Sequence, residues 1–307
     1  MATDLLNRYT WLIDTIRRHG RITRRQLNEC WERSPFSRGR SELPRRTLYN
    51  YRQAIAEIFG INICMDASRY EYYIEESSNA LGEITEWLLD SSATSSALHS
   101  SLDVASRIML ENVPSARENL NPIIEAIRYN HPLRFDYSPY TRVNSTMGVE
   151  VEPYFLRIFR QLWYVTGRCR ADDKVKTYSL DRMHGLQLLP DTFTPPEYGT
   201  EPKEYFKDAF GIMVTQGKPR EVRLKVDSRQ AKYFRALPLH ASQQEEVGDG
   251  YSVFVYKLLL TSDFLAEILS HGSSVEVLAP RELRTMVISS LRDTLALYER
   301  PFDPKVH

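Results

Sequence analysis

The sequence is poor in the residues that build disulfide frameworks and metal sites. Only three cysteines, Cys30, Cys64 and Cys169, occur in 307 residues, and they lie far apart with no CxxC pair. This spacing argues against a disulfide framework or a structural zinc site, and it fits a reducing compartment. The seven histidines also show no metal-ligand spacing. We therefore expect no metal site.

Long apolar segments are lacking as well. The first residues, MATDLLNRYTWL, do not contain the apolar core of a signal peptide. No apolar run approaches the roughly 20 residues that a membrane-spanning helix needs. These features predict a cytoplasmic protein without a membrane partner.

Several enzyme motifs are absent from the sequence. It contains no GxxxxGK[ST] loop, no GxGxxG, no HExxH and no GxSxG. Asp172-Asp173 is a carboxylate pair, but its polar surroundings predict a solvated turn. We expect no catalytic site and no cofactor. Carboxylates can still converge from distant positions, so a metal-dependent nucleic-acid-processing enzyme remains an alternative.

Net charge is also absent, because 40 basic and 40 acidic residues cancel, but the charge is unevenly distributed. The segment from Arg17 to Arg52 has eleven arginines, no lysine and three acidic residues, a net charge of +8. The segment from Glu75 to Glu111 has seven acidic residues and one arginine, a net charge of −6. The basic segment lies near the N-terminus, and we call this part of the chain the basic head. A basic head on a neutral chain suggests that this segment binds a polyanion.

Apolar periodicity divides the basic head into helices. Thr23 is expected to open the second helix, with Gln26 as its capping-box partner, and Pro44 stands at the first position of a third. The buried stripe of the first helix is expected to comprise Leu5, Tyr9, Leu12, Ile13 and Ile16. The corresponding stripe of the third helix is expected to comprise Leu48, Tyr51, Ile55 and Ile58.

The third helix carries basic and amide side chains on its other face. Arginine suits guanine, and asparagine or glutamine suits adenine. INICM, DASR and YEYYI follow and predict a hairpin, so the segment has the pattern of a winged helix-turn-helix. The residues expected to contact a double-stranded DNA operator are Arg24, Arg25, Arg45, Arg46, Tyr49, Asn50, Gln53 and Arg69. The alternative is a solvated basic helix in an ordinary three-helix domain.

A run of short strands is predicted further along the chain. LRFDYS, VEPYFLRIF, LWYVTGR, KTYSLDRM and GLQLL are separated by polar turns, which predicts a small β-barrel. Within them, PYFLRIFRQLWYVTGR and KTYSLDRM resemble the WYL domain, which is named for a Trp-Tyr-Leu triplet. Here the triplet reads Trp163-Tyr164-Val165, and an LDR ends at Arg182. The resemblance covers roughly residues 119–195 and implies an Sm-like, SH3-type barrel.

The whole chain resembles bacterial transcriptional regulators that join a winged helix, a WYL domain and a C-terminal extension. The resemblance implies a homodimer whose WYL domain senses a ligand, which is nucleic acid in some members. It places Tyr154, Arg157, Arg168 and Arg182 around a positively charged pocket. Arginine binds phosphate at two points and tyrosine stacks on bases, so a nucleotide or single-stranded nucleic acid is the expected ligand.

The strand that contains the Trp163-Tyr164-Val165 triplet is expected to present two different faces. Strand alternation puts Trp163 and Val165 on one face and Tyr164 and Thr166 on the other, and we assign Trp163 to packing. The alternative for the four ligand residues is that the arginines are solvated or paired with acids. The acidic residues available for such pairs are Asp136, Asp172, Asp173 and Asp181.

The C-terminal segment predicts the order βαββαβ with an added helix, which is ferredoxin-like. The added helix has an apolar stripe that either joins two copies or caps its own sheet: Leu283, Val287, Leu291 and Leu295. The expected fold class is α+β multidomain. We divide the chain into a winged helix-turn-helix (1–76), a helical linker (77–118), a WYL domain (119–200) and a C-terminal extension (201–307). The function expected is a ligand-responsive, dimeric DNA-binding regulator, and a non-regulatory nucleic-acid-binding protein is a further alternative.

Overall fold

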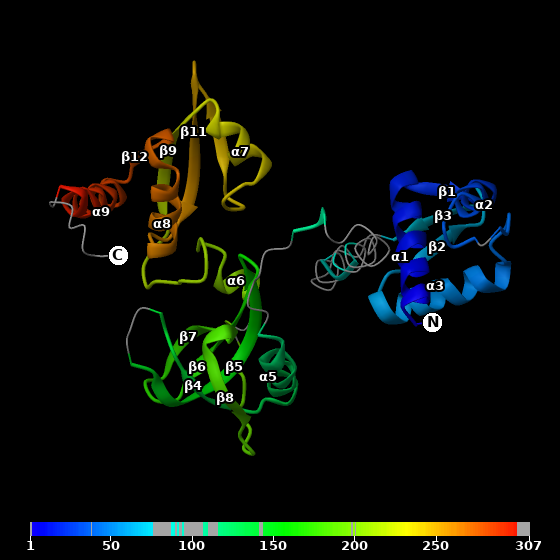
Figure 1. Ribbon diagram of the computed structural model, residues 1–307, viewed down its shortest axis with the longest axis horizontal. Helices are drawn as coiled ribbons and strands as arrows, with labels where there is room; N and C mark the ends of the chain where they lie inside the picture. The colour runs from blue at the N-terminus through cyan, green and yellow to red at the C-terminus, as the bar shows by residue number, and fades with distance from the viewer. Residues whose placement is uncertain are drawn as a thin grey trace. The chain divides into compact units, whose positions relative to one another are not determined.

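The computed structural model describes residues 2–75 except 38, then 87–89, 91, 94, 107–109, 116–140, 144–197, 199 and 201–299. Contacts divide the chain into two compact units, Met1–Glu111 and Asn112–His307. Nearly all of the linker predicted at 77–118 lies outside the described residues. Figure 1 shows the elements of each unit.

Up to Ile74, the N-terminal unit combines helices with a small antiparallel sheet. Its elements are α1 (Ala2–His19), β1 (Arg21–Thr23), α2 (Arg24–Glu32), α3 (Arg45–Phe59), β2 (Ile63–Asp66) and β3 (Glu71–Ile74). The strands pair in the order β1-β3-β2. The three expected helices and the hairpin are present. Strand β1 was not expected, because only four residues separate α1 from α2.

The start of α2 follows from local chemistry. The Thr23 amide donates to Gln26 Oε1 at 2.9 Å, and the Gln26 amide donates to the Thr23 hydroxyl oxygen at 3.4 Å. The predicted capping box is therefore confirmed. Helix α3 begins at Arg45 with Pro44 as its N-cap, one residue later than expected.

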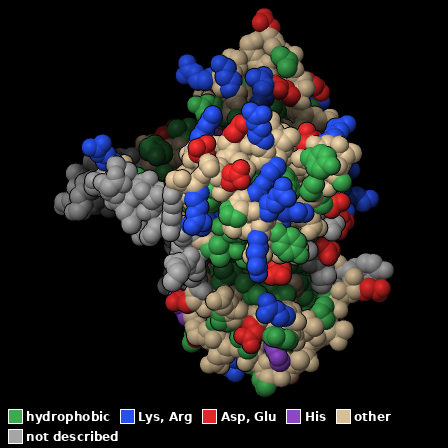
Figure 2. Space-filling model, turned by 90° about the vertical axis from the view of Figure 1, so that its right-hand side faces the viewer, with side chains coloured by type: hydrophobic (Ala, Val, Ile, Leu, Met, Phe, Trp, Pro, Cys, Tyr) green, Lys and Arg blue, Asp and Glu red, His purple; other side chains and the backbone are tan. Residues whose placement is uncertain are grey.

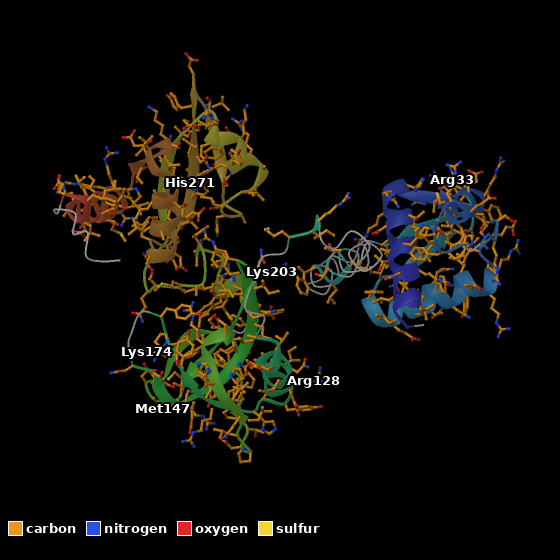
Figure 3. All side chains as sticks on the ribbon, viewed as in Figure 1. Arg33, Arg128, Met147, Lys174, Lys203 and His271 are labelled. Carbon is orange, nitrogen blue, oxygen red and sulfur yellow. The ribbon has the colours of Figure 1, made fainter. Side chains whose placement is uncertain are left out.

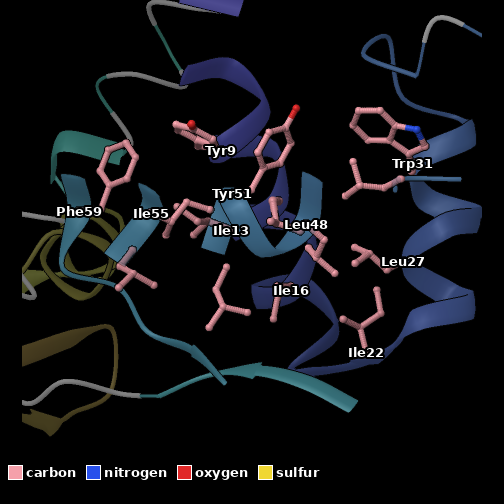
Figure 4. Close-up of a cluster of buried hydrophobic side chains, with 14 of the residues drawn as sticks. Tyr9, Ile13, Ile16, Ile22, Leu27, Trp31, Leu48, Tyr51, Ile55 and Phe59 are labelled. Atoms are coloured by element: carbon pink, nitrogen blue, oxygen red, sulfur yellow. The ribbon is translucent and has the colours of Figure 1, made fainter. Parts of the chain in front are cut away.

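The core of this unit lies between the three helices and the sheet (Figure 4). Residues Leu48, Tyr51, Ile55 and Phe59 form the buried row of α3. The prediction of Ile58 in this row was wrong, because a helix turns about 100° per residue and Phe59 continues the row. Leu5 is also exposed, whereas the other four residues predicted for α1 are buried.

The second unit begins with a helix that packs against a five-stranded antiparallel sheet. Its elements are α5 (Arg117–Tyr129), β4 (Leu133–Tyr137), β5 (Thr146–Phe159), β6 (Leu162–Cys169), β7 (Lys174–Ser179), η2 (Leu180–Arg182) and β8 (Met183–Leu188). The strand order is β7-β6-β5-β4-β8. Strand β5 starts five residues earlier than predicted. The LDR segment is a short 3₁₀ helix between two strands rather than part of a strand.

A short helix, α6 (Pro202–Tyr205), leads to a second sheet with its own core. The elements are β9 (Arg220–Asp227), α7 (Gln230–Ala236), β10 (Gln244–Val247), β11 (Tyr251–Leu258), α8 (Ser262–Ser270), η3 (Gly272–Ser274), β12 (Val275–Ala279) and α9 (Arg281–Tyr298). The strands pair antiparallel in the order β10-β11-β9-β12. The βαββαβ order read from the sequence is observed, with α9 as the added helix.

The apolar stripe of α9 is divided between two environments. Leu283 in the first turn is fully buried against the sheet, whereas Leu291 and Leu295 are 54% and 56% exposed. In Figure 1 the helix, drawn in red, leads away from the sheet. The first turns therefore cap their own sheet, and the distal half presents uncovered apolar side chains within the described chain.

No helix in the described part of the chain combines the length and the apolar character needed to cross a membrane.

Candidate functional site

The exposed side of α3 carries two parallel rows of side chains. Arg46, Asn50 and Gln53 follow one another at helical spacing, and all three are exposed. We call them the outer row. These side chains have the donors and acceptors that read base edges. The sequence analysis had placed them on one face together with Arg45 and Tyr49.

Arg45 and Tyr49 instead belong to a second row, which continues with Arg52. This row borders a hollow of about 390 Å³ between α2, α3 and the β2–β3 hairpin. We call it the α3–hairpin hollow. Its lining residues are Arg24, Arg45, Leu48, Tyr49, Arg52, Met65, Tyr70 and Tyr72. The lining contains three arginines and three tyrosines but no carboxylate.

Two of the hollow's arginines are anchored to the backbone. Arg52 donates from Nε to the Ile63 carbonyl oxygen at 2.8 Å, and its guanidinium lies 5.6 Å from the centroid of the Tyr72 ring. Arg24 donates from Nη2 to the Leu43 carbonyl oxygen. The main chain thus fixes both guanidinium groups in place.

The environment of Arg24 changes its pKa. Burial lowers its pKa, and the neighbouring Arg45 lowers it further, while Tyr72 and Glu42 act in the opposite direction. Its Nη1 atom is buried and has no hydrogen-bond partner among the described residues. A buried guanidinium N–H without an acceptor is costly.

The other predicted DNA-binding residues lie outside the hollow. Arg25 is exposed and pairs with Glu29, four residues along α2, at 3.2 Å. Arg69 lies in the exposed hairpin turn, where Asp66 accepts hydrogen bonds from the Ser68 hydroxyl at 2.6 Å and the Ser68 amide at 2.9 Å.

Three lining residues, Arg52, Tyr70 and Tyr72, were missed by the sequence analysis. Arg52 could have been found, because it follows Arg45 by seven positions and Tyr49 by three, which places it in the same helical row. The two tyrosines could not be placed without knowing how the hairpin meets α3.

The N-terminal unit is rich in arginine and has no lysine, since the first lysine of the chain is Lys174. Figure 2 presents the side on which α2 and the first turns of α3 lie, and basic side chains gather near its centre with hydrophobic ones among them. Arginine binds phosphate through a planar fork, which a lysine ammonium cannot do.

In the second unit, the Trp-Tyr pair faces two environments. Trp163 packs with buried Val165 against the core of the sheet, which confirms its assignment to packing. Tyr164 points to the other face, where it pairs in register with Arg157 on β5 and Ser179 on β7. Tyr164 is buried as well, and this burial raises the pKa of its hydroxyl.

Arg157 and Arg182 lie near Tyr164. The Arg157 guanidinium lies 4.0 Å from the centroid of the Phe206 ring, and burial lowers its pKa while Asp263 on α8 partly offsets that effect. Its Nη1 is buried with no hydrogen-bond partner in the described chain. Arg182 lies 4.0 Å from the centroid of Tyr140, and its Nε is 3.7 Å from Asp181 Oδ2.

Arg168 and Tyr154 lie elsewhere on the sheet. At roughly 3.3 Å per residue along the strands, Tyr154 is about 10 Å and Arg168 about 15 Å from Arg157. Arg168 Nη2 is 2.7 Å from Glu152 Oε2, and its Nη1 is 3.0 Å from Asp173 Oδ1. Arg170 binds the other oxygen of Glu152 at 3.2 Å. The four predicted ligand residues therefore form two groups. The alternative of acid pairing applies to Arg168 with Asp173 and to Arg182 with Asp181.

A second hollow, of about 670 Å³, lies at the other end of this sheet and is bordered by none of these four residues. Figure 3 places Met147 of β5 and Lys174 of β7 at the same end. Its lining includes Tyr137, Cys169, Lys176 and Tyr178. Lys176 is already paired with Asp172 at 2.6 Å.

Among the described residues, no group of three or more histidine, cysteine, aspartate or glutamate side chains could hold a metal ion.

Comparison with known families adds to this geometry. A family model described as the WYL domain matches residues 118–188, and one described as the WCX domain matches residues 218–295. The chain therefore contains a segment that matches the WYL domain. The resemblance predicted from the Trp-Tyr-Val triplet and the LDR segment is thereby confirmed.

Curated and solved relatives are distant. An uncharacterized HTH-type transcriptional regulator, YobV of Bacillus subtilis (strain 168), is 23% identical over 231 residues, covering 73% of this chain and 65% of that protein. The structure of proteasome accessory factor B/C (PafBC) of Arthrobacter aurescens aligns with 98% of this chain and 48% of its own, at 18% identity and a TM-score of 0.42. A CRISPR Cas-related protein aligns with 60% of this chain and 52% of its own, at 12% identity and a TM-score of 0.36. This chain spans less than two thirds of each.

Proposed function

We propose that this protein is a DNA-binding transcriptional regulator whose N-terminal unit is a winged helix-turn-helix. The observation that carries the proposal is the outer row of α3, where Arg46, Asn50 and Gln53 are exposed at helical spacing on a unit rich in arginine. A helix with such a row reads base edges in the major groove. The printed name of the Bacillus subtilis relative supports regulation of transcription.

The test uses a duplex selected from a random pool by the full-length protein, and a random duplex of equal length. Asn50→Ala and Arg46→Ala should each weaken binding to the selected duplex by about 1–3 kcal/mol, the range for one lost base contact. The matched control is Ile58→Ala, an uncharged and exposed change on the same helix that lies in neither row. An Asn50 variant that binds the selected duplex as tightly as the wild type would refute the assignment.

Arg69 is proposed to contact a phosphate through the hairpin turn. Its replacement by alanine should weaken binding to both duplexes alike, because phosphate contacts carry no sequence information. Arg25→Ala provides a comparison, since Arg25 is equally basic but paired with Glu29.

We propose that the protein acts as a homodimer and that the distal half of α9 contributes to the contact. One recognition helix covers only a few base pairs, so two are needed for an operator. Leu291→Asp and Leu295→Asp should yield monomers in light scattering. Leu237→Asp is the matched control, because Leu237 is 75% exposed at the C-cap of α7, next to the same sheet. Dimers that survive both α9 changes would contradict a role for this helix.

The sensing proposal concerns Arg157, Arg182, Tyr154 and Arg168, which would bind an anionic ligand such as a nucleotide or a short single strand. Arg157 carries most of it, because its stacking on Phe206 joins the first sheet to the segment that leads into the second. A ligand that draws the guanidinium away from this ring would change that contact. Coupling to operator affinity of about 1–3 kcal/mol would be typical.

The sensing test measures operator affinity with and without a short single-stranded oligonucleotide. Arg157→Gln should remove the effect of the oligonucleotide. Because it also removes the contact with Phe206, its ligand-free affinity should match that of the ligand-bound wild type, with an unchanged dependence on salt. A fall in ligand-free affinity, with a smaller dependence on salt, would instead identify a second DNA-contacting surface.

A further inference from the structure

The α3–hairpin hollow has a composition that base reading by the outer row does not explain. Arg24, Arg45 and Arg52 reach it from two helices, and the hairpin adds Tyr70 and Tyr72. The lining has no carboxylate, and Glu42, which lies outside the lining, acts on Arg24 without restoring its pKa to the ordinary value. Like charges held together are unfavourable unless an anion lies between them.

One nitrogen atom of Arg24 lacks a hydrogen-bond acceptor in the described part of the chain. Its Nη2 is used by the Leu43 carbonyl, but its Nη1 is buried with no acceptor among the described residues. Arg45 is close enough to lower the pKa of Arg24. A phosphate oxygen in the hollow would supply the missing acceptor and screen the repulsion between the two guanidinium groups.

Tyr70 adds evidence from the backbone. This residue has a φ of 52°, in the left-handed region where glycine is favoured, and its side chain is exposed at the edge of the hollow. A non-glycine residue in this conformation is strained, and such strain is concentrated at binding sites. A hairpin turn with no function in the hollow would be more stable with glycine at this position.

We propose that the α3–hairpin hollow holds one backbone phosphate of a DNA duplex, bound by Arg24, Arg45 and Arg52, with tyrosine side chains against the flanking sugar. This inference rests on the proposed DNA-binding function. It assigns the two rows of α3 to different tasks, since the outer row reads bases and the hollow fixes the position of the helix on the backbone. The volume of about 390 Å³ accommodates a phosphate with its sugar.

The experiment measures duplex affinity of the full-length protein as a function of salt concentration. Each phosphate contact contributes about 0.9 to the slope of log K against log salt. Arg52→Gln should lower this slope by about that amount and weaken binding to selected and random duplexes by the same factor. Arg33→Gln is the control, because Arg33 is an exposed arginine at the end of α2 that does not line the hollow (Figure 3). It should leave the slope unchanged.

Two further variants separate binding from folding. Arg24→Gln should also lower the slope, but the lost contact to Leu43 could reduce stability. Tyr70→Gly relieves the strained φ and removes the ring, so the melting temperature should rise while affinity for both duplexes falls severalfold. A purely structural role for Tyr70 would leave affinity unchanged, and that result would contradict a contact at the sugar.

The outcomes distinguish this inference from the proposed function. If wild type binds duplexes and neither Arg24→Gln nor Arg52→Gln changes the slope, the phosphate site is wrong and the outer row is unaffected. If Arg52→Gln weakens only the selected duplex, Arg52 reads a base and the inference is also overturned.

If the wild type binds no duplex, the proposed function fails, and a free phosphate source then decides the inference. Millimolar pyrophosphate or a mononucleotide is titrated while the arginine Nε–Hε signals are followed by NMR. A saturable shift that Arg52→Gln abolishes would support a phosphate site for free nucleotides, and no shift would overturn it.

Discussion

Glu152 should stabilise the second unit through Arg168, and Asp173 should contribute little although it binds the same arginine. Both carboxylates lie within hydrogen-bond distance of Arg168, at 2.7 and 3.0 Å. The side chain of Glu152 is only 6% exposed, whereas that of Asp173 is 79% exposed. Arg168 therefore forms one ion pair with a buried carboxylate and one with an exposed carboxylate, so the strengths of the two pairs can be compared directly.

The expected magnitudes follow from these exposures. Breaking a buried ion pair costs about 3–5 kcal/mol when the remaining charge stays buried. Here Arg168 is 42% exposed and Arg170 is 30% exposed, so water relieves part of the loss. We expect Glu152→Gln to cost about 2 kcal/mol. Asp173→Asn should cost less than about 1 kcal/mol, as exposed pairs do.

The assay is a double-mutant cycle with Arg168→Gln in the full-length protein. Because the chain has two compact units, a single melting curve is not a two-state transition, and hydrogen exchange of the β5 and β6 amides gives the local free energy. The coupling energy should exceed about 1 kcal/mol for Glu152 and fall below about 0.5 kcal/mol for Asp173. Equal couplings would refute the reasoning that burial decides the strength of these pairs.

Three other predictions concern stability. Gly167→Ala should cost about 1–3 kcal/mol, because an added Cβ would lie 2.7 Å from Val151 Cγ1 and closer still to the backbone. Hydrogen exchange of the β5 and β6 amides would measure this loss. Thr23→Ala should cost about 1 kcal/mol through loss of the capping box, measured as increased exchange of the first amides of α2. Hydrogen bonds from Arg235 lower the pKa of Glu245. At pH values above the ordinary carboxyl pKa, this pair should therefore stabilise the β10–β11 hairpin. The stabilisation should be lost as the pH falls through the lowered pKa of Glu245. Exchange measured against pH should show that fall, and Arg235→Gln should flatten it.

Features that depend on short-range interactions could be predicted from the sequence. The capping box at Thr23 and the βαββαβ order with its added helix both follow from patterns in the sequence, and both are observed. The error at Ile58 has the same origin, because both Ile58 and Phe59 are apolar and only packing decides which one continues the buried row. The mostly polar segment between α2 and α3 ends near Leu43, which is fully buried and whose amide donates to Asn28 Oδ1 at 3.3 Å.

The candidate sites were harder to predict, because they depend on which strands and helices meet. Residue type alone grouped Arg157, Arg168 and Arg182, and only the register between β5 and β6 separates Arg168 from Arg157. Glu152 was not considered as a partner, although it lies directly opposite Arg168 in that register. Counting charges along the chain cannot find such a carboxylate, because the pairing of two strands brings it between the two arginines.

The distribution of acidic partners separates the arginines of this protein into two kinds. Arg168 and Arg170 each contact more than one carboxylate, so a ligand anion would have to compete with an existing partner for either of them. In contrast, Arg52 bonds to a backbone carbonyl and Arg24 has a buried N–H without an acceptor in the described chain. A phosphate gains more from a guanidinium whose charge is not yet neutralised, since it displaces no anion. The arginines of the α3–hairpin hollow, together with Arg157 in the second unit, are therefore the ones best placed to bind a polyanion.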